Sequence, residues 1–404
     1  MESDKRTNEP SLGTSCVHAG EHRRGPAPFP TVTPIYQATT YYFERASDLE
    51  GFLKGERDGY AYSRWGTFTN SALEEAISSL VGGGSTITTA SGMAANFAAL
   101  QAAGLRSGKT LLASKEIYGN SYDIVRDYFE RNGSRCVFTD FKDIEALEQT
   151  MEREQPEVVF FEVLANPTLS VIDAPRVIAL THAAGAKVVI DNTFATPYLY
   201  RPFLDGADYE THSLTKYING HGDALGGSIT CGQENFRDLE SLVCTQGCVL
   251  SPDNAQMIAR GMKTFALRMR QHCANASALA SFLVGRAEIT KVRYPGLGSH
   301  PTNSIAKRLF TSGEFGGMLC FDLAFGGKAK SFALIDALRL MTPAGSLGDV
   351  KSLIVHPSST THHGLSAEEK ERIGIGESTL RVSVGIEDPR DLIRDFERAL
   401  NEII

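Results

Sequence analysis

The chain lacks several features that would mark a secreted, membrane-bound or nucleic-acid-binding protein. Its 404 residues include one tryptophan, Trp65, and seven cysteines that are odd in number and scattered, a pattern that predicts reduced thiols in a cytoplasmic setting. No apolar run approaches the roughly 20 residues that span a bilayer, and the polar N-terminus lacks the apolar stretch of a secretory signal. The net charge of −8 gives no electrostatic reason to expect nucleic acid or an anionic membrane as a partner.

Length and composition predict a soluble protein of two or three domains. The apolar fraction of 42% and the charged fraction of 22% are those of an ordinary globular chain. We expect an N-terminal arm over residues 1–60, a large domain over 61–258 and a smaller α+β domain over 259–404. The arm is expected to be extended and to contact a partner subunit, because it has little periodicity and carries four closely spaced prolines, Pro26, Pro28, Pro30 and Pro34. A frayed terminus is the alternative.

From about residue 72, short β-rich runs alternate with helical ones. This rhythm predicts an α/β fold with a mostly parallel sheet between helices. The expected strands are Ser85–Thr89, Thr110–Ala113, Val158–Phe161, Lys187–Ile190, Gly226–Cys231, Lys291–Tyr294, Gly317–Asp322 and Leu380–Val384. The expected helices are Met93–Leu100, Tyr122–Arg131, Ala174–Ala184 and a long one, Ala255–Ala280, that would link the two domains.

Polar residues follow several of these strands. Asn166 comes soon after one, and Asp191 ends another; ligands in such sheets bind beyond the carboxyl ends of the strands. The small-residue turn at Ser91 and Gly92 lies between a strand and a helix, where free N–H groups can bind an anion. The alternatives are a helix cap at Asp191 and an ordinary turn at Gly92.

The stretch around Lys216 carries the most chemistry. Ser213 and Thr215 lie three residues and one residue before the lysine, and a glycine-rich run, Gly220–Gly227, follows it. A lysine becomes a nucleophile when its charge is suppressed beside a carbonyl carbon, and the two hydroxyls could hold an anion within reach of the amine. The amine fits an aldehyde and the two hydroxyls fit a phosphate group, and a cofactor with both groups is pyridoxal phosphate. A solvated turn is the alternative interpretation.

Taken together, these landmarks resemble the trans-sulfuration (cystathionine γ-synthase-like) family of pyridoxal-phosphate enzymes of cysteine and methionine metabolism. The resemblance covers nearly the whole chain and implies a fold type I pyridoxal-phosphate-dependent transferase. Its motifs occur in the family's order: Val17–Gly20, Tyr62–Arg64, Ser91–Ala95, Tyr118–Gly119, Asp191–Thr193, Ser213–Tyr217, Ser346–Gly348 and Arg381–Asp388.

The resemblance implies a role for each cofactor-binding residue. Lys216 would carry pyridoxal phosphate as a Schiff base and move protons, Asp191 would pair with the pyridine nitrogen, and Tyr118 would stack on the ring and act as an acid or base. Four groups would hold the phosphate: Ser213, Thr215, Gly92 and Met93.

Further residues would complete the site. Asn166 would lie near the phenolic oxygen, and Arg381, helped by Ser346, would bind the substrate α-carboxylate. Tyr62 and Arg64 would reach the cofactor phosphate of a neighbouring subunit, so the resemblance implies a homo-oligomer, a tetramer built from dimers that share active sites. No metal, nucleic acid or membrane is expected at the site.

The expected reaction is γ-elimination on a sulfur-containing amino acid, of the methionine γ-lyase or cystathionine γ-lyase type, which releases a thiol, 2-oxobutyrate and ammonia. The alternative is γ-replacement on an O-acylhomoserine by a thiol, sulfide or carbon nucleophile. The segment His356–His362 is similar to methionine γ-lyases and homoserine-ester sulfhydrylases. Three departures from the family bear on the choice: Gly345 where lyases and synthases of cystathionine have Glu, Asn120 where methionine γ-lyases have Cys, and the altered loop Trp65–Phe68.

Two other classes of protein are compatible with parts of the sequence. A metal-dependent hydrolase could use one of two groups, His212, His221 and Asp223 or His356, His362 and His363, although neither spacing matches a compact ligand pattern. A non-catalytic pyridoxal-phosphate carrier would need neither Arg381 nor Tyr118, so their presence favours an enzyme.

Overall fold

The structure, a computed structural model, describes residues 10–21, 30–310, 312–361, 366, 368, 370 and 374–403. Two of the arm prolines, Pro26 and Pro28, and two of the histidines considered as metal ligands, His362 and His363, lie outside the described residues.

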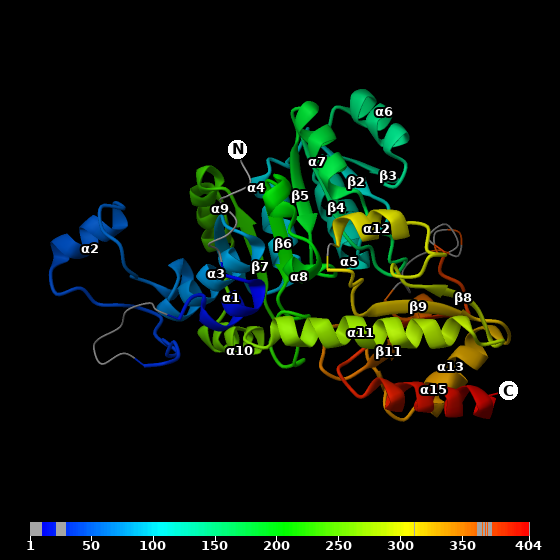
Figure 1. Cartoon of the computed structure of the whole chain (residues 1–404). Helices are drawn as coiled ribbons and strands as arrows, with labels where there is room; N and C mark the ends of the chain where they lie inside the picture. Colours follow the sequence, from blue (N-terminus) through cyan, green and yellow to red (C-terminus); the bar gives the residue numbers. More distant parts are fainter. Residues whose placement is uncertain are drawn as a thin grey trace, which may run out of the picture.

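A seven-stranded sheet forms the centre of the large domain (Figure 1). It contains the five predicted strands of this domain and two that the sequence did not predict, β3 and β6. Strand β7 runs antiparallel to both its neighbours, while the pairs from β6 to β3 are parallel. The order across the sheet is β1 (Ser85–Thr89), β7 (Gly227–Cys231), β6 (Tyr209–Ser213), β5 (Lys187–Asp191), β4 (Val158–Glu162), β2 (Thr110–Ser114) and β3 (Arg135–Thr139).

Helices cover both faces of this sheet. The helices and turns of this domain are α3 (Phe68–Val81), α4 (Gly92–Ala102), α5 (Gly119–Asp123), the π-helical turn η3 (Ile124–Glu130), α6 (Ile144–Glu154), α7 (Ala174–Ala183), α8 (Thr196–Leu199), α9 (Gln233–Gln246) and the 3₁₀ turns η2 (Ser63–Trp65) and η4 (Pro202–Asp205). Strand β4 shows why both faces are covered. Its alternate residues Val158 and Phe160 pack with α4 and α9, whereas Val159 and Phe161 pack with α3 and α7, and all four are fully buried.

Two short helices interrupt the arm that the sequence predicted to be extended. Helix α1 (Leu12–His18) is capped by the Ser11 hydroxyl, which accepts a hydrogen bond from the N–H of Thr14, and its Cys16 is buried in the large core. Helix α2 (Ala46–Leu53) lies apart from the body of the chain (Figure 1), with Leu53 71% exposed. The prediction of an extended chain was therefore wrong for these two segments. Capping by Ser11 and burial of Cys16 account for α1, whereas α2 has no side-chain cap and buries only Gly51 among the described residues.

The single helix predicted over Ala255–Ala280 is also wrong. The chain forms α10 (Pro252–Met262) and the longer α11 (Phe265–Val284), with a break at two residues between them. The buried guanidinium of Arg268 donates to the carbonyl oxygens of Gly261, Tyr217 and Ile218 at 2.8, 2.6 and 3.0 Å. We attribute the break between α10 and α11 to these hydrogen bonds, because the Gly261 carbonyl is turned toward Arg268.

The smaller domain packs on the far end of α11 (Figure 1). Its strands form a five-stranded sheet in the order β10 (Thr342–Pro343), β11 (Leu353–Val355), β12 (Thr379–Ser383), β9 (Met318–Leu323) and β8 (Ile289–Arg293). One face packs against α11, α13 (Gly327–Ala337) and α15 (Pro389–Ile403), while α12 (Asn303–Leu309) contributes to the large core and η5 (Pro357–Ser359) follows β11.

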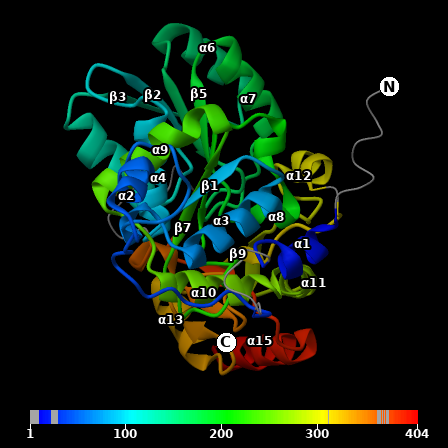
Figure 2. The ribbon, with the colours of Figure 1, turned by 90° about the vertical axis from the view of Figure 1, so that its left-hand side faces the viewer.

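The predicted α/β architecture is confirmed: a mostly parallel sheet between helices, with a smaller sheet domain after it. Figure 2 shows α13 and α15 of the smaller domain below the large domain, with α10 and α11 at a level between them. Strands β4, β5 and β6 point their carboxyl ends the same way, so the residues that follow them meet in one region. Within the described ranges, no helix is long and apolar enough to cross a membrane.

Candidate functional site

Lys216 lies in the turn that follows β6 and points into a cavity of about 180 Å³. Its Nζ donates a hydrogen bond to the Ser346 hydroxyl at 3.0 Å. Burial, together with the positive charge of Arg381, lowers the pKa of the amine to about 8. The lysine is therefore partly neutral near physiological pH, as a nucleophile toward an aldehyde must be.

Asp191, at the end of β5, is held on both carboxylate oxygens. Its Oδ2 accepts a hydrogen bond from Asn96 Nδ2 at 2.8 Å, and its Oδ1 accepts one from the N–H of Thr193 at 3.0 Å. Asn96 is in turn fixed by the hydroxyl of Thr211, which donates to its Oδ1 at 2.5 Å. The carboxylate is thus held in one orientation, with room to meet a ring nitrogen in the cavity.

The first turn of α4 lies against the residues before Lys216. Ser91 caps the helix by accepting a hydrogen bond from the N–H of Ala94 at 3.1 Å. A Cβ added at Gly92 would come within 2.6 Å of the Ser213 Cβ, so only glycine allows this approach. The two segments together form a small cradle of N–H and hydroxyl groups, which suits a phosphate. Met93 lines the same cavity.

Thr215 is oriented by the backbone on the other side of the cradle. Its hydroxyl donates to the carbonyl of Gly226 at 3.1 Å and accepts from the N–H of the same residue at 3.1 Å. Both contacts hold Thr215 in place at the cavity wall, beside Lys216.

Arg381, on β12 (Thr379–Ser383) of the smaller domain, also lines the cavity. It is buried, and its Nη atoms donate to Asn166 Oδ1 at 2.9 Å and to the carbonyl of Ser346 at 3.3 Å. Its Nε has no hydrogen-bond partner among the described residues. A buried guanidinium with a free donor is suited to bind a carboxylate.

Tyr118 precedes α5, and its side chain lines the cavity beside Arg381 and Asn166. Burial raises the pKa of its phenol, while the charge of Arg381 acts in the opposite direction. The structure therefore brings together ten of the twelve residues predicted for the site: Lys216, Asp191, Ser213, Thr215, Gly92, Met93, Tyr118, Asn166, Ser346 and Arg381.

Tyr62 and Arg64 are the two that a single chain does not bring to this cavity. Arg64 donates to the carbonyl of Cys244 at 3.1 Å and lies over the Tyr62 ring, 5.4 Å from its centroid. Arg64 and Trp65 line a separate cavity of about 590 Å³.

The cavity is lined by further residues that were not predicted as site residues: Ser91, Asn96, Glu162, Thr193, Phe194, Leu225, Gly345, Leu347 and Thr361. Most of them lie within stretches that the sequence had already marked, but Asn96, Glu162 and Phe194 do not. Asn96 could have been noticed as an amide one turn into a helix of small apolar residues. Gly345 has open space around it, since an added Cβ would meet nothing within 4 Å.

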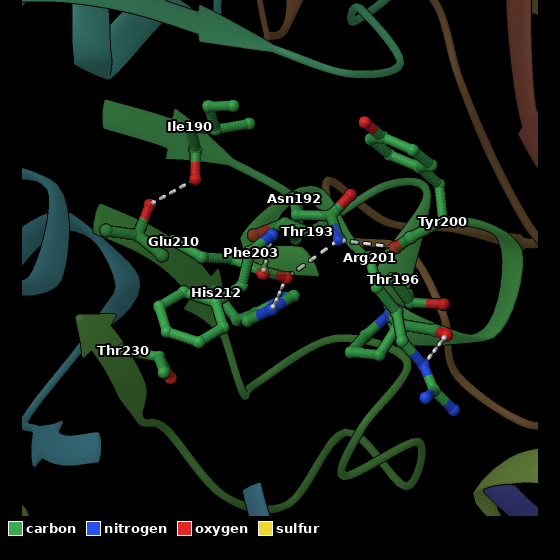
Figure 3. Close-up of polar contacts among 12 residues, drawn as sticks. Ile190, Asn192, Thr193, Thr196, Tyr200, Arg201, Phe203, Glu210, His212 and Thr230 are labelled. Carbon is green, nitrogen blue, oxygen red and sulfur yellow. Dashed lines mark hydrogen bonds and ion pairs between the residues drawn. The ribbon is translucent and has the colours of Figure 1, made fainter. Parts of the chain in front are cut away.

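A buried polar network lies behind the site, on the other face of β6 (Figure 3). The Glu210 carboxylate accepts hydrogen bonds from His212 Nε2 at 2.8 Å, from Asn192 Nδ2 at 2.9 Å and from the N–H of Phe203 at 3.1 Å. Asn192 also donates to the carbonyl of Tyr200. This network fixes the segments that carry Asp191 and Ser213, and it gives His212 a structural partner.

The other histidines that the sequence suggested as metal ligands contact protein atoms of the chain, where the structure describes these histidines. His221 Nδ1 lies 2.7 Å from the carbonyl of Asn219, and His356 contacts the Ser359 hydroxyl and the carbonyl of Glu377. Over the described residues, no group of three or more His, Cys, Asp or Glu side chains is placed to hold a metal ion.

Comparisons with known proteins agree over the whole chain. The family model described as Cys/Met metabolism PLP-dependent enzyme matches residues 13–401. The chain is 37% identical over 404 residues to an L-methionine gamma-lyase of Fusobacterium nucleatum subsp. polymorphum (98% of this chain, 100% of the relative). It is 38% identical over 376 residues to an O-succinylhomoserine sulfhydrylase of Mycobacterium tuberculosis (92% and 91%).

A solved structure from Campylobacter jejuni, described as an O-acetylhomoserine (thiol)-lyase, matches the fold with a TM-score of 0.91 at 30% identity. The match covers 97% of this chain and 100% of that one, and that protein carries N'-pyridoxyl-lysine-5'-monophosphate.

Proposed function

Because this chain belongs to the Cys/Met metabolism family of PLP-dependent enzymes, we propose that it catalyses γ-elimination on a methionine-like amino acid. Water is consumed, and the products are a thiol, 2-oxobutyrate and ammonia. The family and the relatives establish a pyridoxal-phosphate-dependent carbon–sulfur lyase or synthase of fold type I; the particular reaction is the proposal.

The residues around Lys216 fit the cofactor, which when bound supplies an electron sink for carbanion chemistry. Lys216 would meet its aldehyde, and Asp191 its ring nitrogen. The first turn of α4 at Gly92 and the Ser213 hydroxyl would hold its phosphate. The closeness of Gly92 to Ser213, which leaves no room for a Cβ, supports this assignment because it keeps backbone N–H groups next to a hydroxyl.

The remaining roles belong to the chain's own side chains. We propose that Arg381 holds the substrate carboxylate and that Lys216, with its lowered pKa, moves protons at the α- and β-carbons. Tyr118 would exchange a proton with the γ-substituent as it leaves. Arg381 is buried, and Lys216 and Tyr118 are half-buried, which limits the access of bulk water to these transfers.

The charged residues that line the cavity are the reason for proposing a methionine-like substrate. Among the described lining residues, the only cationic ones are Lys216 and Arg381, and the only acidic ones are Asp191 and Glu162. With Arg381 on the α-carboxylate and Lys216 joined to the cofactor aldehyde, no cation among the described lining residues would remain for a second carboxylate. Gly345 provides no side-chain carboxylate for a distal ammonium. An uncharged γ-substituent is therefore favoured.

A second candidate is γ-replacement on an O-acylhomoserine by sulfide or a thiol, because the chain is 38% identical to the sulfhydrylase and 37% identical to the lyase. Elimination and replacement share their early proton transfers, so the same residues would serve both.

We further propose a homotetramer built from dimers in which Tyr62 and Arg64 reach the cofactor phosphate of the partner. Their distance from the chain's own Lys216 cavity supports this, since in one chain Arg64 lines a different cavity. We also propose a cytoplasmic setting, because all seven cysteines are free thiols. Size-exclusion chromatography with light scattering would test the assembly; a monomer with full activity would contradict it.

The reaction is tested by supplying purified holoenzyme with methionine, or with O-acetylhomoserine with and without sulfide, and measuring 2-oxobutyrate and released thiol. We expect 2-oxobutyrate and methanethiol from methionine alone. Consumption of O-acetylhomoserine only when sulfide is present, with methionine inert, would replace this proposal by the second candidate. Lys216→Ala should abolish turnover yet retain some non-covalent cofactor. Lys109→Ala, which removes a lysine paired with Glu157 outside the cavity, is the matched control.

A further inference from the structure

Glu162 is a buried carboxyl in the cavity for which the proposed chemistry has no use. It is the last residue of β4 and is 4% exposed. Its Oε1 accepts a hydrogen bond from the backbone N–H of Tyr118 at 2.5 Å, and the N–H of Asn166 also interacts with the carboxyl. One side chain thus contacts the backbone of two residues that line the cavity.

The backbone N–H of Tyr118 relies on Glu162 for a hydrogen-bond acceptor. Tyr118 is the residue before the five-residue helix α5, so its N–H has no place in the helical hydrogen-bond pattern, and no side chain of the described residues caps the helix. A π-helical turn follows directly, so the segment has little regular helix to hold it. The Glu162 carboxyl is the acceptor that the structure provides for this N–H.

The surroundings of Glu162 argue against an ionised, proton-moving role. Glu162 is directly opposite Asp191 in the parallel pair β4·β5, so the two carboxyls point to the same face of the sheet. Asp191 is stabilised by Asn96 and by a backbone N–H. Burial and the neighbouring Asp191 carboxylate both raise the pKa of Glu162. A neutral carboxylic acid still offers its carbonyl oxygen to Tyr118.

A second contact between the same two loops lies outside the cavity. The Thr168 hydroxyl donates to Glu116 Oε2 at 3.0 Å, and Glu116 is paired with Lys142. This contact joins the segment before Tyr118 to the segment after Asn166 without touching the Tyr118 N–H. It provides a control in the same region.

We propose that Glu162 is a positioning residue that fixes Tyr118 over the cofactor site through its backbone N–H. The inference rests on the proposed function only for the role of Tyr118. Gln is the neutral isostere of a protonated Glu and retains the accepting oxygen, so Glu162→Gln should preserve the position of Tyr118. Glu162→Ala removes the acceptor, and Glu162→Asp draws it back by one methylene.

The test uses holoenzyme of the wild type, these three variants and the control Thr168→Val. Hydrogen exchange of the peptide containing Tyr118, followed by mass spectrometry without substrate, reports the anchor directly. We expect exchange about tenfold faster or more in Glu162→Ala and Glu162→Asp, and within about threefold of wild type in Glu162→Gln and Thr168→Val. Unchanged exchange in both Glu162→Ala and Glu162→Asp would overturn the proposal; if Glu162→Ala does not fold, Glu162→Asp alone decides.

Turnover separates positioning from catalysis. We expect kcat to fall about 10- to 100-fold in Glu162→Ala, to recover in Glu162→Gln, and to fall no further when Glu162→Ala is added to Tyr118→Ala. An inactive Glu162→Gln would overturn the proposal by showing that the ionised carboxylate is needed. If the wild type does not act on methionine, the proposed function fails, but the exchange measurement still decides whether Glu162 anchors Tyr118.

Discussion

Replacing Arg381 by lysine tests the assignment of the carboxylate-binding residue while keeping a positive charge in the cavity. Arg381 is held by Asn166 and by the carbonyl of Ser346, at 2.9 and 3.3 Å, and presents a free Nε. The lysine ammonium is a single point of charge and cannot form a two-pronged contact with a carboxylate.

The size of the effect follows from the hydrogen bonds that the substitution removes. A bidentate carboxylate makes two charged hydrogen bonds, and lysine can replace one. A hydrogen bond to a charged group contributes about 1.5–3 kcal/mol, and about 1.4 kcal/mol corresponds to a factor of ten. We therefore expect kcat/KM to fall by about 10- to 140-fold in Arg381→Lys, with most of the change in KM if the contact is equally strong in the ground and transition states.

The assay is steady-state release of 2-oxobutyrate, with the visible absorption of the bound cofactor recorded for each variant. Arg293→Lys is the matched control, because Arg293 forms a two-pronged ion pair with Asp322 at 2.9 and 2.7 Å, outside the cavity. Its kcat/KM should match the wild type. An Arg381→Lys enzyme with unchanged kcat/KM, or one that has lost its cofactor but binds substrate normally, would refute the assignment.

Three further predictions concern the cofactor cradle and the buried titratable groups. Gly92→Ala should weaken cofactor binding about tenfold or more, because its Cβ would lie 2.6 Å from the Ser213 Cβ; titration of apoprotein checks this, and Gly345→Ala, which has open space, should bind as the wild type does. The rate of covalent cofactor capture by apoprotein should rise with pH, reach half its maximum near pH 8 and level off above about pH 9, since the pKa of Lys216 is lowered to about 8. A midpoint near pH 10 in stopped-flow absorbance would contradict the lowered pKa. Burial lowers the pKa of His272 to about 4, so between about pH 6.5 and 4 the unfolded chain binds a proton at this histidine that the folded chain does not, and the free energy of unfolding should fall as the pH falls through this range. Denaturation midpoints measured across this range should decline less in His272→Asn than in the wild type. Equal declines in the two proteins would contradict the lowered pKa.

The strand ends illustrate what the sequence can predict. Asp191 and Asn166 follow apolar runs, and a parallel sheet brings such positions to one edge, so their meeting was predictable. The lysine stretch and the turn at Gly92 were predictable for the same reason, because each carries its signal within a few residues. Arg381, by contrast, lies far along the chain, and only the family resemblance assigned it to the site.

Residues whose roles depend on pairing between distant segments could not be predicted. Glu162 has the sequence pattern of a buried strand's end, and its contacts with Tyr118 arise only when β4 is placed next to the loop before α5. The break between α10 and α11 is similar, because helix-forming residues continue through it and the interruption depends on Arg268 reaching the carbonyls of Tyr217 and Gly261. In both cases tertiary contacts override local propensity.

The most direct test of the central claim, that the Lys216 cavity is the cofactor site, is to reduce the holoenzyme with borohydride and map the pyridoxylated peptide by mass spectrometry. We predict a single modified lysine, Lys216. Modification at another lysine, or none in an enzyme that is fully active, would contradict the site described here.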